Sequence, residues 1–234
     1  MPTVTPPVKV ALVDDHDILR AGVGAFLTSL PGYALVGEAD SARAGIAMIE
    51  SEKPDVVLMD VVLPGMDGIV ATREILRRLP DARVVALSAH AEIHDVIDAI
   101  NAGVVGYVLK ADPPETLLEA LAHAMQGAFY VAPALRDRLS AYTSAKGSNA
   151  DVLDVLSERE REIFRLAADC STATEIAGEL CISRKTVDCH LHNINRKLGL
   201  HDRAQLVRLA VRIGLVHAVR SPSGEIRSRR DPMV

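Results

Sequence analysis

The first half of the chain alternates between short apolar runs and longer amphipathic stretches. Branched apolar residues dominate runs of the length of buried strands, at residues 8–15, 33–40, 55–61, 82–89 and 106–111. Amphipathic stretches with helical spacing separate these runs. Five strands alternating with five helices predict an α/β fold, a doubly wound parallel sheet with right-handed crossovers, over residues 1–130. Asp112 is predicted to cap the fifth helix, with Pro113 at its first position and Glu115 completing a capping box.

The pattern changes after residue 130. Residues 131–152 end in a small, polar stretch that predicts a linker. Beyond it the strand pattern disappears, and two capping boxes, Ser157 with Glu160 and Thr172 with Glu175, each open a helical period. A break at residues 181–183 precedes a third helix, and a fourth is predicted at 203–213. We therefore expect a small all-α domain at 153–217, followed by a disordered tail at 218–234.

Charge is divided unequally between these two parts. Residues 1–130 hold 9 basic and 18 acidic side chains, whereas residues 131–234 hold 17 and 13, so the net charge of −5 divides into −9 and +4. Such a division indicates two domains with different partners. The apolar runs are too short to cross a bilayer, no signal peptide opens the chain, and the three cysteines lack CxxC spacing. We expect a cytoplasmic protein with reduced thiols.

Polar side chains follow four of the five predicted strands. The first is followed by Asp14 and Asp15, the third by Asp60, the fourth by Ser88 and the fifth by Lys110. The carboxyl ends of parallel strands meet at one edge of a sheet, so these side chains should lie together. Clustered carboxylates need a cation, and oxygen ligands suit Mg²⁺. Phosphoryl transfer uses such a metal with a hydroxyl, a lysine and a nucleophile, here the Asp60 carboxylate.

The order and spacing of these residues resemble the receiver domain of two-component response regulators. The matching motifs lie at 13–16, 59–60, 63–68, 87–89 and 107–110. The resemblance implies that Asp60 accepts phosphate from a sensor histidine kinase. It also implies a set of supporting residues: Asp14, Asp15, Asp60 and the carbonyl of Val62 for Mg²⁺, Ser88 and Lys110 for the phosphoryl oxygens, and Tyr107 as the switch aromatic. Taken alone, Tyr107 fits a core or rim position better than a switch position. Ala111 and Ser88 replace the commoner proline and threonine without removing a chemical role.

Two enzyme interpretations are disfavoured. Gly22-Val23-Gly24 is a fragment of a dinucleotide fingerprint, but it lacks the third glycine and lies inside a helical pattern. Aspartate-nucleophile phosphatases resemble the Asp60 motif, but they need a second acid where Val62 stands. We therefore expect no turnover enzyme, since a receiver catalyses only its own modification.

The predicted third helix of the second domain has one apolar face, formed by Val187, Leu191, Ile194 and Leu198. A short helix, a tight break and then this helix describe a helix-turn-helix, whose second helix enters the major groove. Residues 184–213 hold seven Lys or Arg against two acids, which places positive charge where phosphates would lie. Cys189, His190 and His192 are a weak zinc candidate, because adjacent helical residues point apart.

The second domain resembles the LuxR-type DNA-binding domain, in motifs at 156–160, 175–177, 185–187 and 197–198. Together with the receiver it resembles the NarL/FixJ subfamily, in which the inactive receiver hides the recognition helix and activation frees dimerisation. Face and resemblance together predict DNA contacts from Arg184, Lys185, Thr186, Asp188, Cys189, His192, Arg196 and Lys197. Asp188 either selects a cytosine or pairs with Arg184. Cys170 stands where relatives carry glycine.

These predictions combine into a transcription regulator that is switched by phosphorylation and binds double-stranded promoter DNA as a homodimer. Two other hypotheses stay open. A regulator of the same fold could act without phosphorylation, controlled by abundance, a ligand or the cysteines 170, 181 and 189. Alternatively, an interaction protein could only titrate the kinase's phosphate.

Overall fold

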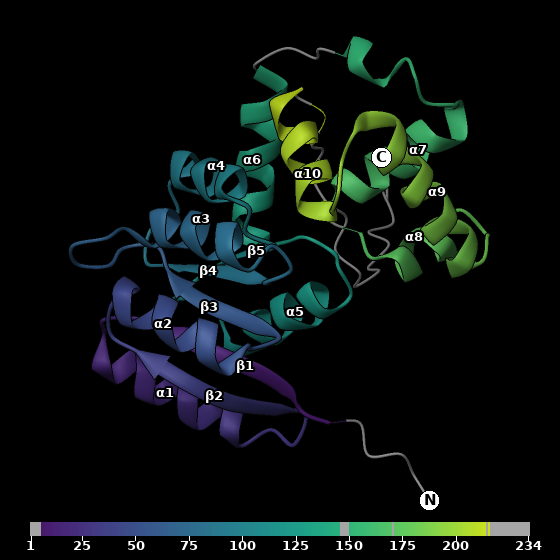
Figure 1. The fold of residues 1–234 in the computed structure, drawn as a ribbon. Coiled ribbons are helices and arrows are strands. Elements are labelled where there is room, and N and C mark those ends of the chain that lie inside the picture. Colours follow the sequence, from purple (N-terminus) through teal and green to yellow (C-terminus); the bar gives the residue numbers. More distant parts are fainter. Residues whose placement is uncertain (1–5, 146–149, 170, 214, 216–234) are drawn as a thin grey trace, which may run out of the picture.

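The computed structural model describes residues 6–145, 150–169, 171–213 and 215. Its first domain is a parallel sheet of six strands in the order β2-β1-β3-β4-β5-β6 (Figure 1). The strands are β1 (Val8–Val13), β2 (Tyr33–Ala39), β3 (Val56–Asp60), β4 (Val84–Ser88), β5 (Gly106–Leu109) and β6 (Tyr130–Val131). The predicted α/β class and the five predicted strands are confirmed. The strand count was wrong by one, because β6 has only two residues, too few for a pattern, and forms by pairing with β5.

Helices cover both faces of the sheet. The helices are α1 (Asp17–Thr28), α2 (Ala42–Glu52), α3 (Gly68–Arg78), α4 (Ile93–Ala102) and α5 (Pro114–Met125). Val10 and Leu12 of β1 pack into one core with α1 and α5, whereas Ala11 and Val13 pack into the other with α2, α3 and α4. The central strands are therefore buried on both faces, which is why they appear in the sequence as continuous apolar runs, whereas the edge strand β2 is mostly half-buried.

The predicted cap of α5 was wrong. The helix begins at Pro114 with Pro113 as its N-cap, one residue later than expected. A residue before a proline avoids the helical conformation, so Pro113 is extended, with ψ of 149°, and cannot be the first helical residue. Asp112 instead accepts a hydrogen bond from the backbone N–H of Leu109 at 3.1 Å. It closes the turn after β5 rather than capping the helix.

Much of the predicted linker at 131–152 is helical. It contains α6 (Pro133–Ala145) and a 3₁₀ helix, η1 (Ala150–Leu153), while residues 146–149 lie outside the described residues. Leu135 and Leu139, one helical turn apart, are fully buried in the core. Their packing decides the structure of this segment despite its small, polar composition.

The second domain consists of α7 (Glu158–Ala168), α8 (Ala173–Glu179), α9 (Arg184–Leu198) and α10 (Arg203–Arg212). Both predicted capping boxes are confirmed, because the Ser157 and Thr172 side chains each accept the N3 backbone N–H and receive the reciprocal bond. Cys181 lies in the predicted break with a positive φ of 52°. The tail at 218–234 and Cys170 lie outside the described residues.

The two domains meet at α4. In Figure 1, α10 lies to the right of α4 and beside α6, and α10 packs against both α7 of its own domain and α4 of the first. The linker helix α6 also packs against α4. Within the described ranges, none of the helices combines the length and apolar character needed to span a membrane. A movement of α4 will therefore change its contacts with both α6 and α10.

Candidate functional site

The predicted strand-end cluster comes together at one edge of the sheet. Asp14 and Asp60 are buried at the ends of neighbouring strands, since β1 pairs with β3 up to Val13 and Met59. The Lys110 ammonium lies 2.8 Å from Asp14 Oδ2 and 2.7 Å from Asp60 Oδ2. Parallel strand pairing thus brings residues that are far apart in the sequence together in one pocket, as expected for this class of sheet.

Close packing of the backbone holds Asp60 in place. Gly68, the first residue of α3, donates its N–H to the Val61 carbonyl at 2.9 Å. A Cβ at this glycine would lie 1.8 Å from the Asp60 carbonyl oxygen, so only glycine fits. The geometry of this turn therefore depends on a residue that has no part in the chemistry.

Burial and ion pairing oppose each other in this pocket. Burial raises the pKa of Asp60, the hydrogen bond from Lys110 acts against that rise, and the Asp14 charge adds to it. Burial alone would lower the pKa of Lys110, but its bonds to Asp14 and Asp60 outweigh burial and raise it. Lys110 is therefore a fixed cation, and the buried carboxylates gain further stabilisation from any additional positive charge.

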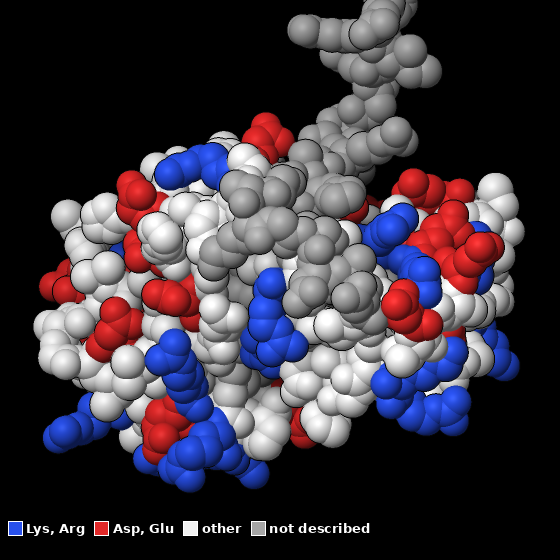
Figure 2. Space-filling view, turned by 90° about the horizontal axis from the view of Figure 1, so that it is seen from above, with Lys and Arg blue, Asp and Glu red and all other residues white. Residues whose placement is uncertain are grey.

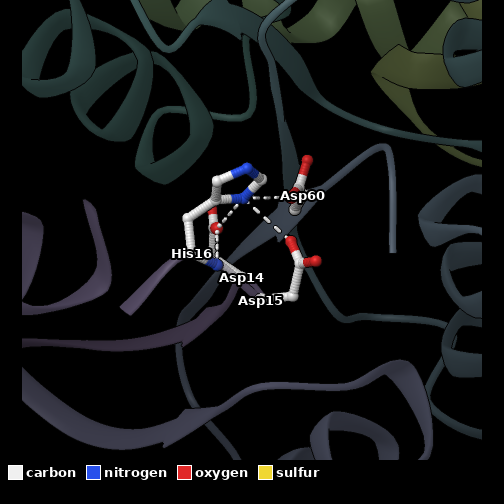
Figure 3. Close-up of side chains that lie close together, drawn as sticks. All are labelled: Asp14, Asp15, His16 and Asp60. Atoms are coloured by element: carbon white, nitrogen blue, oxygen red, sulfur yellow. Dashed lines mark hydrogen bonds and ion pairs between the residues drawn. The ribbon is translucent and has the colours of Figure 1, made fainter. Parts of the chain in front are cut away.

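His16 completes the rim of the pocket. Its Nδ1 lies 2.8 Å from Asp15 Oδ1, 3.1 Å from Asp14 Oδ1 and 3.8 Å from Asp60 Oδ2, as the dashed lines in Figure 3 show. Ligand atoms of these four residues all lie within 4.8 Å of one another. His16 was not among the predicted site residues. Its position directly after two acids at a strand end could have indicated that it lies in this pocket.

The donor set fits a divalent cation. Three carboxylates converge from two strand ends, and hard oxygen donors are the ligands that Mg²⁺ prefers. Asp14, Asp15 and Asp60 would hold the ion, which would neutralise charge on a phosphoryl group beside Asp60. Val62 donates its N–H to Asp60 Oδ1 at 3.1 Å, and its carbonyl stays a predicted ligand.

The loop after β4 is bonded on two sides. The buried Ser88 hydroxyl oxygen accepts the N–H of His90 at 3.0 Å, and the Tyr107 hydroxyl donates to the His90 carbonyl at 3.3 Å. Tyr107 is fully buried, and burial raises its pKa. Tyr107 thus occupies a core position and also contacts the loop after β4 at His90, and its role as the switch aromatic stays a prediction.

Residues outside the receiver contact both ends of α4. Arg138 of α6 donates to the Ala91 carbonyl just before α4, and the His94 and Tyr142 rings pack edge to face with centroids 5.8 Å apart. At the other end, a Cβ on Gly103 would lie 2.8 Å from Arg208 Nη1 of α10. A contiguous set of contacts therefore runs from Ser88 through α4 to α6 and α10.

The predicted DNA-contact face of α9 is open. All eight members of the predicted set are exposed, namely Arg184, Lys185, Thr186, Asp188, Cys189, His192, Arg196 and Lys197. Val187 and Ile194 are buried on the opposite face. In Figure 2 the second domain lies at the right, where a group of Lys and Arg lies at the lower edge and the Asp and Glu higher up are mixed with further Lys and Arg.

Two ion pairs involve charged residues of α9. Lys197 Nζ lies 2.7 Å from Glu160 of α7, and this hydrogen bond is the main cause of the Glu160 pKa falling to about 2. Lys197 therefore ties α9 to α7. Arg184 and Asp188 are 3.9 Å apart and both well exposed, a geometry that contributes little to stability. Asp188 is thus left accessible on the α9 face.

Known families match both domains. Residues 10–122 match the response regulator receiver domain, and residues 154–210 match the luxR family of bacterial regulatory proteins. The chain belongs to the two-component response regulators, specifically the NarL/FixJ type with a LuxR-type helix-turn-helix. It is 36% identical over 211 residues to the response regulator GacA of Pseudomonas syringae pv. syringae, covering 90% of this chain and 99% of GacA. The transcriptional regulatory protein LiaR of Bacillus subtilis is also 36% identical, over 210 residues that cover 90% of this chain and 100% of LiaR.

Solved structures of the same type are similar across both domains. RcsB of Salmonella typhimurium has a TM-score of 0.56 at 26% identity, covering 88% of this chain and 98% of that chain. An RcsB–DNA complex has a TM-score of 0.55 at 27% identity, covering 88% and 99%. The similarity therefore includes the DNA-binding domain as well as the receiver.

Proposed function

We propose that this response regulator is a sequence-specific transcription regulator, switched in the cytoplasm by phosphorylation of Asp60. The observation that carries the proposal is the buried Asp60 carboxylate, 2.7 Å from Lys110 and beside two further acids, in a chain whose α9 exposes a polar, basic face. The RcsB–DNA complex supports a DNA partner by similarity. The receiver match supports a histidine kinase as phosphoryl donor.

The chemistry follows from the pocket. Asp60 Oδ attacks the phosphorus of a phosphohistidine, forming a P–O bond while the P–N bond breaks, and the imidazole leaves with the electron pair and gains a proton. A bound Mg²⁺ supplies positive charge to the phosphoryl oxygens. Lys110 neutralises further charge, and the Ser88 hydroxyl donates to a phosphoryl oxygen while still accepting from His90. The product is an acyl phosphate on Asp60, a mixed anhydride that water can later hydrolyse.

The receiver has an exposed apolar surface beside this pocket that suits the binding of a histidine kinase. Ile18, at the start of α1, is 91% exposed. A groove between α1 and α5 reaches Lys110 and is lined by Leu19, Phe26 and Pro113. An exposed apolar surface next to the acceptor lets a partner bind there and present its phosphohistidine to Asp60.

The switch acts through α4. When Ser88 turns to the phosphoryl group, the loop that is bonded to Ser88 through His90 and to Arg138 through Ala91 moves, and the contacts of α4 with α6 and α10 weaken. The recognition helix was expected to be hidden, but its face is exposed here, and α10 is packed on α4 instead. Phosphorylation therefore releases α10 for a two-fold contact with a second copy, by shifting a pre-existing equilibrium.

A binding titration tests this function. A duplex selected from a random DNA pool is titrated with full-length protein before and after treatment with acetyl phosphate and Mg²⁺. We expect the treated protein to bind about 5- to 150-fold tighter, the usual range for coupling between two sites. Equal affinity in a sample that carries the phosphoryl adduct would favour the phosphorylation-independent regulator. Failure of either sample to bind any duplex would favour the interaction protein.

Arg138→Ala is predicted to raise the DNA affinity of the unphosphorylated protein. It removes the bond to the Ala91 carbonyl and the 3.9 Å contact with Glu92. The untreated variant should bind the selected duplex about 5-fold or more tighter than the untreated native protein, a coupling of about 1 kcal/mol. Fluorescence anisotropy of labelled duplex measures this directly.

Arg136→Ala is the matched control on the same helix. Arg136 donates to the Val131 carbonyl at 2.8 Å and lies over the Tyr130 ring, so its partners belong to β6 rather than α4. Its removal should leave the affinity of the untreated protein for DNA unchanged. Equal effects of the two substitutions would mean that α6 packing in general, and not the Arg138 contact, sets the affinity.

A further inference from the structure

We propose that Asp188 of α9 determines part of the DNA sequence that this protein selects, by accepting a hydrogen bond from the N4 amino group of one cytosine in each half-site. This inference rests on the proposed function, sequence-specific DNA binding, and deepens it by naming one base and the residue that selects it. Asp188 is an exposed acid on the helix face that is predicted to contact DNA, where its charge opposes binding to phosphates.

Asp188 lies in a row of exposed side chains along α9. Residues four apart in a helix share one face, and the members of this row are Arg184, Asp188, His192 and Arg196. The apolar face of α9 is buried on the other side, and the helix lies at the right of the second domain, away from α4 (Figure 1). Asp188 is about 6 Å along the helix from Arg184. It therefore lies in the N-terminal half of α9, the part of a recognition helix that contacts base edges.

No contact inside the described part of the protein accounts for this acid. Arg184 Nε lies 3.9 Å from Asp188 Oδ2, beyond hydrogen-bond distance, and the two side chains are 63% and 56% exposed. Among the residues that the structure describes, no other cation pairs with Asp188 and no hydrogen bond reaches its carboxylate. Ser183 caps the helix by accepting the Thr186 N–H at 3.1 Å, and Asp188 lies beyond the first turn, within which the helix dipole favours an acid. The carboxylate is therefore available to a ligand from outside.

The chemistry of DNA determines which group this ligand is. Phosphates repel a carboxylate, and an ionised carboxylate can only accept hydrogen bonds. In the major groove guanine and thymine present oxygen acceptors, whereas cytosine N4 and adenine N6 are amino donors. Adenine also places the N7 acceptor beside its amino group, where the second carboxylate oxygen would meet a lone pair, and cytosine has no acceptor there. The acid therefore favours cytosine and rejects guanine and thymine.

The neighbouring cations allow the acid to approach DNA. Arg184 precedes Asp188 by one turn and Arg196 follows it by two, so positive charge lies on both sides of the carboxylate along the row. Attraction of these cations to phosphates offsets the repulsion of the single acid. Removal of the Asp188 charge should therefore raise the affinity for duplexes that lack the cytosine and lower the discrimination between bases.

The test measures base preference in the full-length protein after treatment with acetyl phosphate and Mg²⁺. The native protein first selects a duplex from a random DNA pool, and fluorescence anisotropy then gives its affinity for each single base-pair variant of that duplex. We expect one position in each half-site at which C·G is preferred about 5- to 150-fold. Asp188→Ala should reduce this preference to less than about twofold, and Asp188→Asn should shift it to A·T, because an amide pairs with adenine N6 and N7.

A base analogue tests the contact at the atom concerned. A pyrimidinone analogue of cytosine, which lacks the N4 amino group, is placed at the selected position. It should lower the affinity of the native protein about 5-fold or more and leave that of Asp188→Ala unchanged, since only a direct contact couples the two changes. Equal losses in both proteins would contradict the contact.

Glu179→Gln is the control for charge. Glu179 is an exposed acid at the end of α8, and none of the ion pairs among the described residues involves it. Its substitution removes the same charge from the same helix-turn-helix and should leave the base preference at every position unchanged. Preferences that stay the same in both Asp188 variants, or that change equally in Glu179→Gln, overturn the assignment of Asp188. If the native protein selects no sequence at all, the proposed function itself fails, so the two failures are distinguishable.

Discussion

After incubation with acetyl phosphate and Mg²⁺, the native protein should gain one phosphoryl group and Asp60→Asn should gain none. The substitution replaces the assigned nucleophile by an amide, which does not attack phosphorus, and so the expected loss is complete. Asn keeps the shape of Asp60, and its single amide oxygen can still accept from the Val62 N–H, whereas the bond from Lys110 to the second oxygen is lost. Intact-mass spectrometry of both proteins, with and without Mg²⁺, measures the result.

Asp67→Asn is the matched control for this substitution. Asp67→Asn removes the same charge in the same turn. Asp67 is the N-cap of α3, and its side chain accepts the Ile69 N–H at 2.6 Å. Asparagine caps helices as well as aspartate, so α3 should remain intact. Asp67→Asn should gain the phosphoryl group like the native protein. An adduct on Asp60→Asn would place the acceptor elsewhere and contradict the assignment.

The combined substitution Arg184→Ala and Lys185→Ala should weaken DNA binding about 30- to 1000-fold, since each contact is worth about 1–2 kcal/mol. Both side chains are exposed in the first turn of α9, at the end that enters the major groove in helix-turn-helix proteins. The slope of log affinity against log salt should fall by about 2 if both contact phosphates. Anisotropy titrations at several salt concentrations measure both quantities.

A matched control removes the same charge elsewhere. Arg43 of α2 and Arg73 of α3 are exposed on the receiver, and no ion pair involves either of them within the described part of the chain. Arg43→Ala with Arg73→Ala lowers the net charge equally and should leave the DNA affinity and its salt slope nearly unchanged. If both double variants lost affinity equally, general charge rather than the α9 face would determine DNA binding.

The sequence by itself determined the local structure of this protein. Four of the five long strands, β1, β3, β4 and β5, are largely buried on both faces, so each appears as an apolar run that needs no knowledge of its neighbours, whereas the edge strand β2 is only half-buried. The caps at Ser157 and Thr172 involve residues three apart, and such bonds are set within one turn. The cap at Asp112 was wrong because two successive prolines moved the helix start, and β6 was missed because two residues carry no period.

The candidate site was predictable in part. Asp14, Asp60 and Lys110 could be placed together because parallel strands align their carboxyl ends, a property of the whole sheet. The direction of the His16 side chain could not be placed, because it depends on how the turn after β1 lies against β3. Sequence spacing indicates which strand end carries a residue, but it does not fix the rotamer.

Only the tertiary structure decided the partners that cross between elements. Lys197 was assigned to the DNA-contact set from its helix, yet it lies against Glu160 of another helix. Arg138 contacts the loop after Ser88 because α6 packs on α4. Helical and strand periods fix which face of an element a side chain occupies, whereas its partner depends on the packing of elements distant in the sequence, a contact that no local pattern encodes.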